Sequence, residues 1–108
     1  MRLEAYETTD GKVPFMMWFD GLDSARRRAV QRRLRAIEES DHFGQRKNLR
    51  GGLHELKFRE AIRIYFAEVD GQFVLLLGGS GKRDQIREIE KARRRLKDFR
   101  QRIRRGQS

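Results

Sequence analysis

The sequence lacks cysteine altogether and has one proline and two histidines among its 108 residues. Without cysteine it can form no disulfide framework, no thiolate zinc site and no cysteine nucleophile. Its longest apolar run is Phe73 to Leu77, five residues, far short of the roughly 20 residues that span a bilayer. The first residues, Met1 to Glu4, include no apolar signal segment. We therefore expect a cytoplasmic protein that does not enter a membrane.

Positive charge is what the sequence has in excess. Charged residues make up 39% of the chain, and 26 Lys and Arg against 16 Asp and Glu give a net charge of +10. Residues 1–80 contribute +2, from 14 basic and 12 acidic residues, whereas residues 81–108 contribute +8, from 12 basic and 4 acidic. Such a chain is expected to bind a polyanion, which can be nucleic acid, the ribosome or an acidic protein.

The residue pattern predicts an α+β fold with a single domain over residues 1–108. An antiparallel sheet of about four strands packs against an N-terminal helical hairpin, and a basic C-terminal helix follows at about residues 84–104. The strands are expected at residues 3–8, 53–58, 62–69 and 72–78, the first two helices at 15–20 and 23–39, and a loop at 40–52. The apolar stripe of the last helix consists of Ile86, Ile89, Leu96, Phe99 and Ile103.

Turn residues suggest a register for both hairpins of the sheet. Asp70-Gly71 is typical of a two-residue loop, which would pair Phe66 with Leu75 and Arg63 with Gly78 and gather the apolar residues on one face. In the other hairpin, a three-residue loop at residues 59–61 would pair Lys57 with Arg63 and Glu55 with Tyr65. A two-residue loop there would mix the two faces, so the pattern favours three residues.

The expected Lys57–Arg63 pair is the first candidate site. Like charges directly opposite each other destabilise a sheet, so a bound phosphate is one means of compensation. Lys82 and Arg83 follow the third strand of this sheet, and all four cations are expected to converge on one concave face, with Glu55 and Tyr65 one row away. The alternative is that these are ordinary solvent-facing charges whose repulsion Glu55 relieves.

Three other features invite a functional interpretation. The glycine-rich segment at residues 78–81 is expected to be a turn between strand and helix, either a phosphate-binding nest or a flexible connection. His54 is either a proton shuttle near the cationic face or an ordinary surface histidine, and no metal site is expected. The two arginine-rich helices are expected to pack on the sheet and, in addition, to bind nucleic acid or an acidic partner.

Nearly the whole chain carries a distinctive order of short segments. These are Pro14-Phe15 with Trp18 and Leu22; Gly51 followed by Leu53-His54-Glu55-Leu56-Lys57; Ile62-Arg63-Ile64-Tyr65-Phe66; Leu75-Leu76-Leu77 leading to Gly78-Gly79 and Lys82; and Gln85, Ile89 and Ala92. In this order and spacing the sequence resembles the RelE/ParE superfamily of type II toxins, especially the HigB-like, phage-derived addiction module killer proteins.

The resemblance implies a toxin that is neutralised by a cognate antitoxin, often a helix-turn-helix protein, in a hetero-oligomer. Many such toxins are ribosome-dependent endoribonucleases that cut mRNA and use no metal or other cofactor. Carried over by position, the catalytic residues are Lys57, Arg63 and Arg83. Further RNA or phosphate contacts are expected from Lys82, Glu55, His54, Tyr65 and Arg59. The chain departs from the pattern at Ile89, where RelE-like enzymes often carry a catalytic tyrosine, and at Glu55, which replaces a basic residue.

The expected reaction is attack of an RNA 2′-hydroxyl on the adjacent phosphate, which leaves a cyclic phosphate. Arg63 and Arg83 would stabilise the charge that develops on the phosphoryl oxygens, and Lys57 would do the same or act as general base. Glu55 and His54 are the other candidates for the base. Two alternatives remain open: a non-catalytic toxin of the ParE type, which poisons DNA gyrase, and an RNA- or DNA-binding module without activity.

Overall fold

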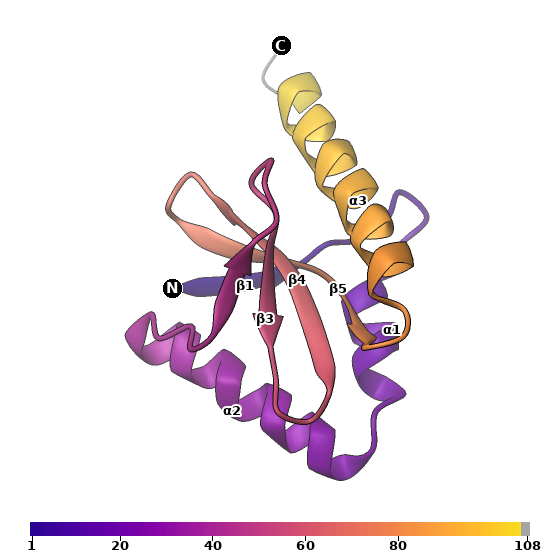
Figure 1. Ribbon diagram of the computed structural model, residues 1–108. Coiled ribbons are helices and arrows are strands. Elements are labelled where there is room, and N and C mark those ends of the chain that lie inside the picture. The colour runs from indigo at the N-terminus through magenta and orange to yellow at the C-terminus, as the bar shows by residue number, and fades with distance from the viewer. Residues whose placement is uncertain (107–108) are drawn as a thin grey trace.

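The computed structural model describes residues 1–106, which form a five-stranded sheet with helices on both faces (Figure 1). The elements are β1 (Arg2–Ala5), α1 (Pro14–Asp20), α2 (Ser24–Ser40), β2 (Arg46–Asn48), β3 (His54–Lys57), β4 (Ile62–Val69), β5 (Phe73–Gly81) and α3 (Gln85–Gly106). This arrangement confirms the predicted α+β class, the helical hairpin and the long C-terminal helix. The strand order is β1-β5-β4-β3-β2, in which β1 runs parallel to β5 and the other pairs are antiparallel. Strand β2, in a segment expected to be loop, is the fifth strand.

The local sequence explains where α1 and α2 begin and end. Pro14 occupies the first position of α1, where its missing N–H costs no hydrogen bond. The Asp23 carboxylate accepts a hydrogen bond from the Arg26 N–H at 2.8 Å and so caps the start of α2. Asp41 ends α2 in the left-handed conformation, with φ of 53°.

The predicted register of the β3–β4 hairpin is confirmed. Lys57 pairs with Arg63 and Glu55 with Tyr65. Ala61, at the end of the three-residue turn, has φ of 62°, the left-handed conformation that glycine usually supplies in such loops. The alternation of side chains therefore places Lys57, Arg63, Glu55 and Tyr65 on one face.

The predicted register of the β4–β5 hairpin is wrong. Val69 pairs with Phe73 around a three-residue loop, so the register is shifted by one residue, and a bulge beside Tyr65 and Phe66 shifts it by a second. Arg63 therefore pairs with Ser80 instead of Gly78. The hydrophobic pattern could not fix this register, because the unbroken run at residues 73–77 supplies apolar side chains to either face.

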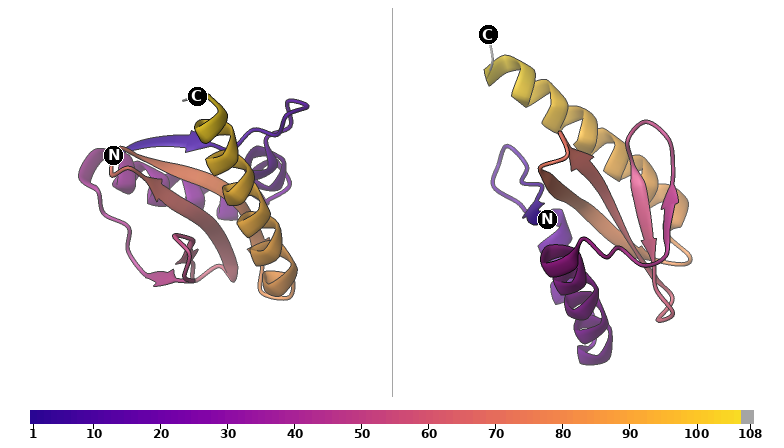
Figure 2. Two further views of the ribbon diagram at one scale, coloured as in Figure 1. Left: turned by 90° about the horizontal axis from the view of Figure 1, so that it is seen from above. Right: turned by 90° about the vertical axis from the view of Figure 1, so that its left-hand side faces the viewer.

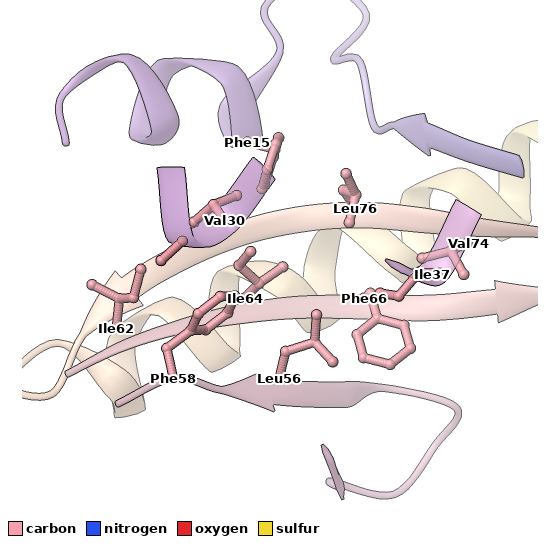
Figure 3. Close-up of a cluster of buried hydrophobic side chains, with 11 residues drawn as sticks. Phe15, Val30, Ile37, Leu56, Phe58, Ile62, Ile64, Phe66, Val74 and Leu76 are labelled. Carbon is pink, nitrogen blue, oxygen red and sulfur yellow. The ribbon is translucent and has the colours of Figure 1, made fainter. Parts of the chain in front are cut away.

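Two hydrophobic cores lie on opposite faces of the sheet, so the expectation of one apolar face is also wrong. The first, between the sheet and the pair α1–α2 (Figure 3), includes Phe15, Val30, Ile37, Leu56, Phe58, Ile62, Ile64, Phe66, Val74 and Leu76. The second, between the sheet and α3, includes Tyr6, Leu53, Tyr65, Ala67, Leu75, Leu77, Ala92 and Leu96. The two further views show α3 and the α1–α2 pair on opposite sides of the sheet (Figure 2).

Helix α3 buries a shorter stripe than its sequence suggests. Ala92 and Leu96 are buried, and Ile89 and Phe99 pack against the second core. Ile86, in contrast, is 80% exposed, and Ile103 at the other end of the helix is 37% exposed. The expectation that Ile86 belongs to the buried stripe is therefore wrong.

Candidate functional site

The paired side chains of Lys57 and Arg63 lie on the face of the sheet that α3 covers. Their strands, β3 and β4, are joined by a three-residue turn, and this tight connection holds the two residues opposite each other. Tyr65, on the same face, belongs to the core beneath α3. Lys57 is half-buried, and the side chain of Arg63 is only 12% exposed. The sheet therefore holds two cations together where water screens them poorly.

Glu55 is the acidic neighbour of this pair. Its Oε1 lies 3.9 Å from Nε of Arg63, and its side chain is 3% exposed. Arg63 also donates from Nη1 to the carbonyl oxygen of Ile62 at 3.0 Å. Its Nε is buried and has no hydrogen-bond partner among the described residues. Glu55 thus offsets part of the Lys57–Arg63 repulsion, and Arg63 keeps a buried donor, which is costly unless a ligand satisfies it.

Two polar contacts fix the surroundings of Arg63. Nε2 of Gln85, at the start of α3, donates to Oε1 of Glu55 at 3.3 Å. The hydroxyl groups of Tyr65 and Ser80 lie 2.8 Å apart in a buried hydrogen bond. Burial also raises the pKa of Tyr65, so its phenol stays neutral. Tyr65 is fully buried and Glu55 nearly so. These two side chains therefore support the residues of the site and are not accessible to a ligand.

The sequence contained a weak signal for these two supporting residues. Gln85 stands at a position named in the family resemblance, but its contact with Glu55 depends on where α3 crosses the sheet. Ser80 was expected in a loop, whereas it lies in β5 opposite Arg63. Its hydrogen bond with Tyr65 depends on the β4–β5 register, which the sequence did not predict.

Lys82 and Arg83 lie in the short turn between β5 and α3, and both are exposed. Gly81, just before them, pairs with Ile62, the neighbour of Arg63. The structure therefore places these two cations at the same end of the sheet as the Lys57–Arg63 pair. They lie outside the sheet face that α3 covers, in a segment that does not pair with a neighbouring strand.

The glycine-rich segment is a strand and not the expected turn. Residues 78–81 pair with β4 throughout, so their backbone groups belong to the sheet and form no phosphate nest. Gly79 lies against α1, and a Cβ added there would overlap the ring of Trp18. On the opposite face, a Cβ on Gly78 would lie 2.7 Å from Nη1 of Arg95. These glycines allow two helices to approach the strand closely.

His54 lies on the opposite face from Lys57 and Arg63. Its ring stacks on Phe66 with centroids 5.4 Å apart, and it belongs to the side that faces the α1–α2 pair. Burial and the nearby charge of Arg46 lower the pKa of His54, which favours the neutral imidazole. The structure therefore does not bring His54 to the candidate site. Arg59 is exposed in the turn after β3, next to the site but outside it.

Many arginines of the two basic helices donate hydrogen bonds to backbone carbonyl oxygens, including some that remain exposed to solvent. On α2, Arg33 donates hydrogen bonds to three carbonyl oxygens, and Arg26 and Arg27 each donate to at least one. On α3, Arg93, Arg95 and Arg100 donate to carbonyls of the sheet and of the segment before β3. Hydrogen bonds from these guanidinium groups help to satisfy backbone carbonyl oxygens. Fewer arginines are therefore available to bind a ligand than the composition suggests.

Residues 1–106 contain neither a cluster of metal ligands nor a membrane-spanning helix. No group of three His, Asp or Glu side chains there is placed to hold a metal ion. No helix in that range has both the length and the apolar character to cross a membrane.

Comparison with known proteins identifies a family. The sequence model of a family described as phage-derived protein Gp49-like matches residues 17–97, which is most of the chain. The matched region runs from α1 through the sheet and into α3, and it contains Lys57, Arg63, Lys82 and Arg83. No protein of curated function matches the sequence.

Proposed function

The chain belongs to the Gp49-like family of phage-derived proteins, a toxin-like family of toxin–antitoxin systems, and we propose that it is a toxin that cleaves mRNA on the ribosome. The observation that carries this proposal is the Lys57–Arg63 pair. Two cations face each other across neighbouring strands, and the buried Nε of Arg63 has no hydrogen-bond partner within residues 1–106. An RNA phosphodiester supplies the negative charge and the acceptor oxygens that this arrangement lacks.

The proposed reaction is transesterification within the RNA. The 2′-oxygen forms a bond to the adjacent phosphorus as the bond from phosphorus to the 5′-oxygen of the next nucleotide breaks. The 2′-hydroxyl proton leaves to a base, and the departing 5′-oxygen takes up a proton. The products are a 2′,3′-cyclic phosphate on one fragment and a 5′-hydroxyl on the other, and no metal takes part.

Arg63 and Arg83 stabilise the charge that develops on the phosphoryl oxygens. Preorganised cations are most effective where water is largely excluded, and Arg63 fits this condition because its side chain is 12% exposed. Arg83 is exposed in the turn before α3 and adjusts to the bound RNA. Lys82, beside it, adds a phosphate contact.

Lys57 is the candidate proton acceptor of this site. It is half-buried and opposite Arg63. Its amine lies beside the place where the RNA phosphate is proposed to bind, within the range of a proton transfer from the 2′-hydroxyl. Glu55, held by Gln85 and close to Arg63, is a positioning residue in this scheme, because it is too deeply buried to meet RNA. Ile89 replaces the tyrosine of RelE-like enzymes and packs in the second core, so it takes no part in the chemistry.

The family also implies an antitoxin partner, which we propose to be a helix-turn-helix protein in a hetero-oligomer with this chain. The toxin acts in the cytoplasm, where ribosomes and mRNA are available. Two other modes of action, poisoning of DNA gyrase and plain nucleic-acid binding, are outcomes of the test below.

The test is expression of the chain without an antitoxin, followed by mapping of mRNA 5′ ends and of DNA breaks. We expect new 5′ ends within translated codons for the wild type, and none for Lys57→Ala combined with Arg63→Ala. DNA breaks that depend on gyrase would instead favour the ParE-like alternative. If neither RNA cleavage nor DNA breaks are detected, the result favours a nucleic-acid-binding module without activity. Arg35→Ala, on the outer face of α2, is the folded control.

A further inference from the structure

A groove of about 460 Å³ lies on the other side of β3, away from α3. One wall is α2, and the other is formed by the segment before β2 and by the turn between β3 and β4. Its lining includes four cations, Arg32, Arg33, Arg59 and Lys57, together with His42 and one acidic residue, Glu60. Lys57 is shared with the Lys57–Arg63 site, and the three arginines are not part of that site.

Arg33 lies half-buried in the groove. It donates from Nε to the carbonyl oxygen of Phe43 at 2.7 Å, from Nη1 to that of Lys57 at 2.7 Å, and from Nη2 to that of Gln45 at 2.6 Å. Its guanidinium also lies 4.7 Å from the ring centre of Phe58. All these partners are uncharged, and Glu60, which lines the same groove, is the acidic residue that offsets part of the positive charge of Arg33. A guanidinium has five N–H groups, and two therefore remain for a ligand.

Arg32 and Arg59 rise from the two walls on either side of Arg33. Arg32 comes from α2 and Arg59 from the turn after β3, and both are exposed. Neither side chain forms a hydrogen bond or an ion pair with another residue of the described range 1–106. Three guanidinium groups thus border one groove, and this side-chain type binds phosphate oxygens in a bidentate manner.

The charges on the walls of the groove decide which ligand we propose for it. Ala29 and Phe58 in its lining are only 6% and 8% exposed, although the lining as a whole presents more apolar than polar surface. Exposed arginines stand on both walls, against one acidic residue, Glu60. A nucleic-acid backbone, which is bound mainly through its charge, fits these walls.

The groove is also continuous with the proposed catalytic site. The carbonyl of Lys57 accepts a hydrogen bond from Arg33 on the groove side, whereas its side chain belongs to the opposite face with Arg63. Only the end of β3 separates the two places, and Arg59 lies in the turn that connects them. One RNA strand that bends around this turn reaches both.

We propose that the groove between α2 and β3 is a second phosphate-binding site, which holds the RNA backbone beside the scissile bond. This inference rests on the proposed action on RNA and adds a specific surface to it. Arg32 and Arg59 contact phosphates from the walls, and Arg33 does so from the floor while it holds the loop before β2.

The test compares two double variants that each remove two positive charges. Arg32→Gln with Arg59→Gln changes the groove, and Arg28→Gln with Arg35→Gln changes exposed positions of α2. Binding of a labelled, single-stranded 2′-O-methyl RNA is measured by fluorescence anisotropy over a range of salt concentrations. This RNA cannot undergo attack by a 2′-hydroxyl, so binding is separated from cleavage.

We expect the groove variant to bind roughly tenfold more weakly and to lower the salt slope by about 1.4, which corresponds to two lost phosphate contacts on a single strand. The control variant should change binding by less than about threefold, because it alters only the net charge. Equal losses in both variants, or no loss in the groove variant, would overturn the proposal. The same holds if the groove variant loses affinity for polyglutamate alone.

The outcome is separable from that of the proposed cleavage. If mRNA is cut in cells but the two double variants bind alike, the groove proposal fails and the nuclease stands. If the groove variant alone binds weakly but no RNA is cut by the wild type, the RNA-binding groove stands and the nuclease fails.

Discussion

The two faces of the sheet use the same strands for different purposes. On the face beneath α1 and α2, Leu56, Ile62 and Ile64 continue an apolar core to the end of the β3–β4 hairpin. On the face beneath α3, their sequence neighbours Lys57 and Arg63 replace that core with charge. Because side chains alternate along a strand, residues on one face stabilise the fold, and their sequence neighbours at the end of the other face form the candidate site. Substitutions at adjacent positions should have effects of different kinds.

The sharpest contrast is between Arg63 and its neighbour Ile64. We expect Arg63→Ala to abolish RNA cleavage, a loss of at least a hundredfold in rate, because a preorganised cation is worth that much in such sites. The free energy of unfolding should fall by only about 1–1.5 kcal/mol, because the variant removes one hydrogen bond, from Nη1 to the Ile62 carbonyl, and a 3.9 Å contact with Glu55, while the Nε has no hydrogen bond to lose among the described residues. Quantitative 5′-end sequencing and urea denaturation measure the two effects.

Ile64→Ala should show the reverse pattern. Ile64 is fully buried in the first core, and loss of its side chain costs about 2–5 kcal/mol of unfolding free energy. The fraction that remains folded should keep its cleavage rate. If Arg63→Ala destabilised the fold as much as Ile64→Ala, the assignment of the two faces would be wrong.

Gly79 tests how closely α1 approaches the sheet. A Cβ at this position overlaps the Trp18 ring, so Gly79→Ala should lower the unfolding free energy by about 1–3 kcal/mol. Gly81→Ala is a matched control, because a Cβ at that end of the same strand meets nothing within 4 Å. A similar loss in both variants would point to backbone effects and not to the contact with α1.

Two arginines of α2 separate structural from free positive charge. Arg33→Ala removes three hydrogen bonds to carbonyl oxygens and should cost about 1.5–3 kcal/mol. Arg35 is exposed, and Arg35→Ala should stay within about 0.5 kcal/mol of wild type. Thermal unfolding followed by circular dichroism provides the comparison, and equal values for the two variants would show that the carbonyl contacts contribute nothing.

The smallest expected effect is a pH dependence that comes from His54. Its pKa in the folded protein is lowered from 6.5 by burial and by Arg46, so the unfolded chain binds the proton more readily. The resulting stability is fully present above pH 6.5 and is lost as the pH falls through the lower folded pKa. His54→Gln should lose this part of the pH dependence in urea titrations between pH 7 and 5. An unchanged curve would mean that His54 is accessible to water in the folded state.

The sequence predicted the elements of the fold better than their pairing. The β3–β4 hairpin was predictable because Leu56, Ile62 and Ile64 alternate with charged residues, so only one register keeps the charges away from the first core. The alternation of residues did not determine the β4–β5 register, since residues 73–77 are apolar at every position and both faces of the sheet are buried. The bulge beside Tyr65 could not be predicted either, because an unbroken apolar run shows no change of pattern at that point.

The candidate site was predictable to the same extent as the hairpin that carries it. Lys57, Arg63, Glu55 and Tyr65 followed from the β3–β4 register. The burial of Tyr65 and Glu55, and the support from Ser80 and Gln85, depend on how α3 crosses the sheet. That crossing is a tertiary arrangement, which the apolar stripe of one helix does not determine.

The most direct test of the central claim is the chemistry of the RNA ends. A reconstituted translation reaction with one mRNA is incubated with the wild-type chain or with Lys57→Ala combined with Arg63→Ala, and 2′,3′-cyclic phosphate ends are captured by a ligase specific for them. We expect cyclic phosphate ends within the reading frame for the wild type, and a loss of at least a hundredfold in the variant. Absence of such ends in the wild type, or equal amounts in both, would contradict it.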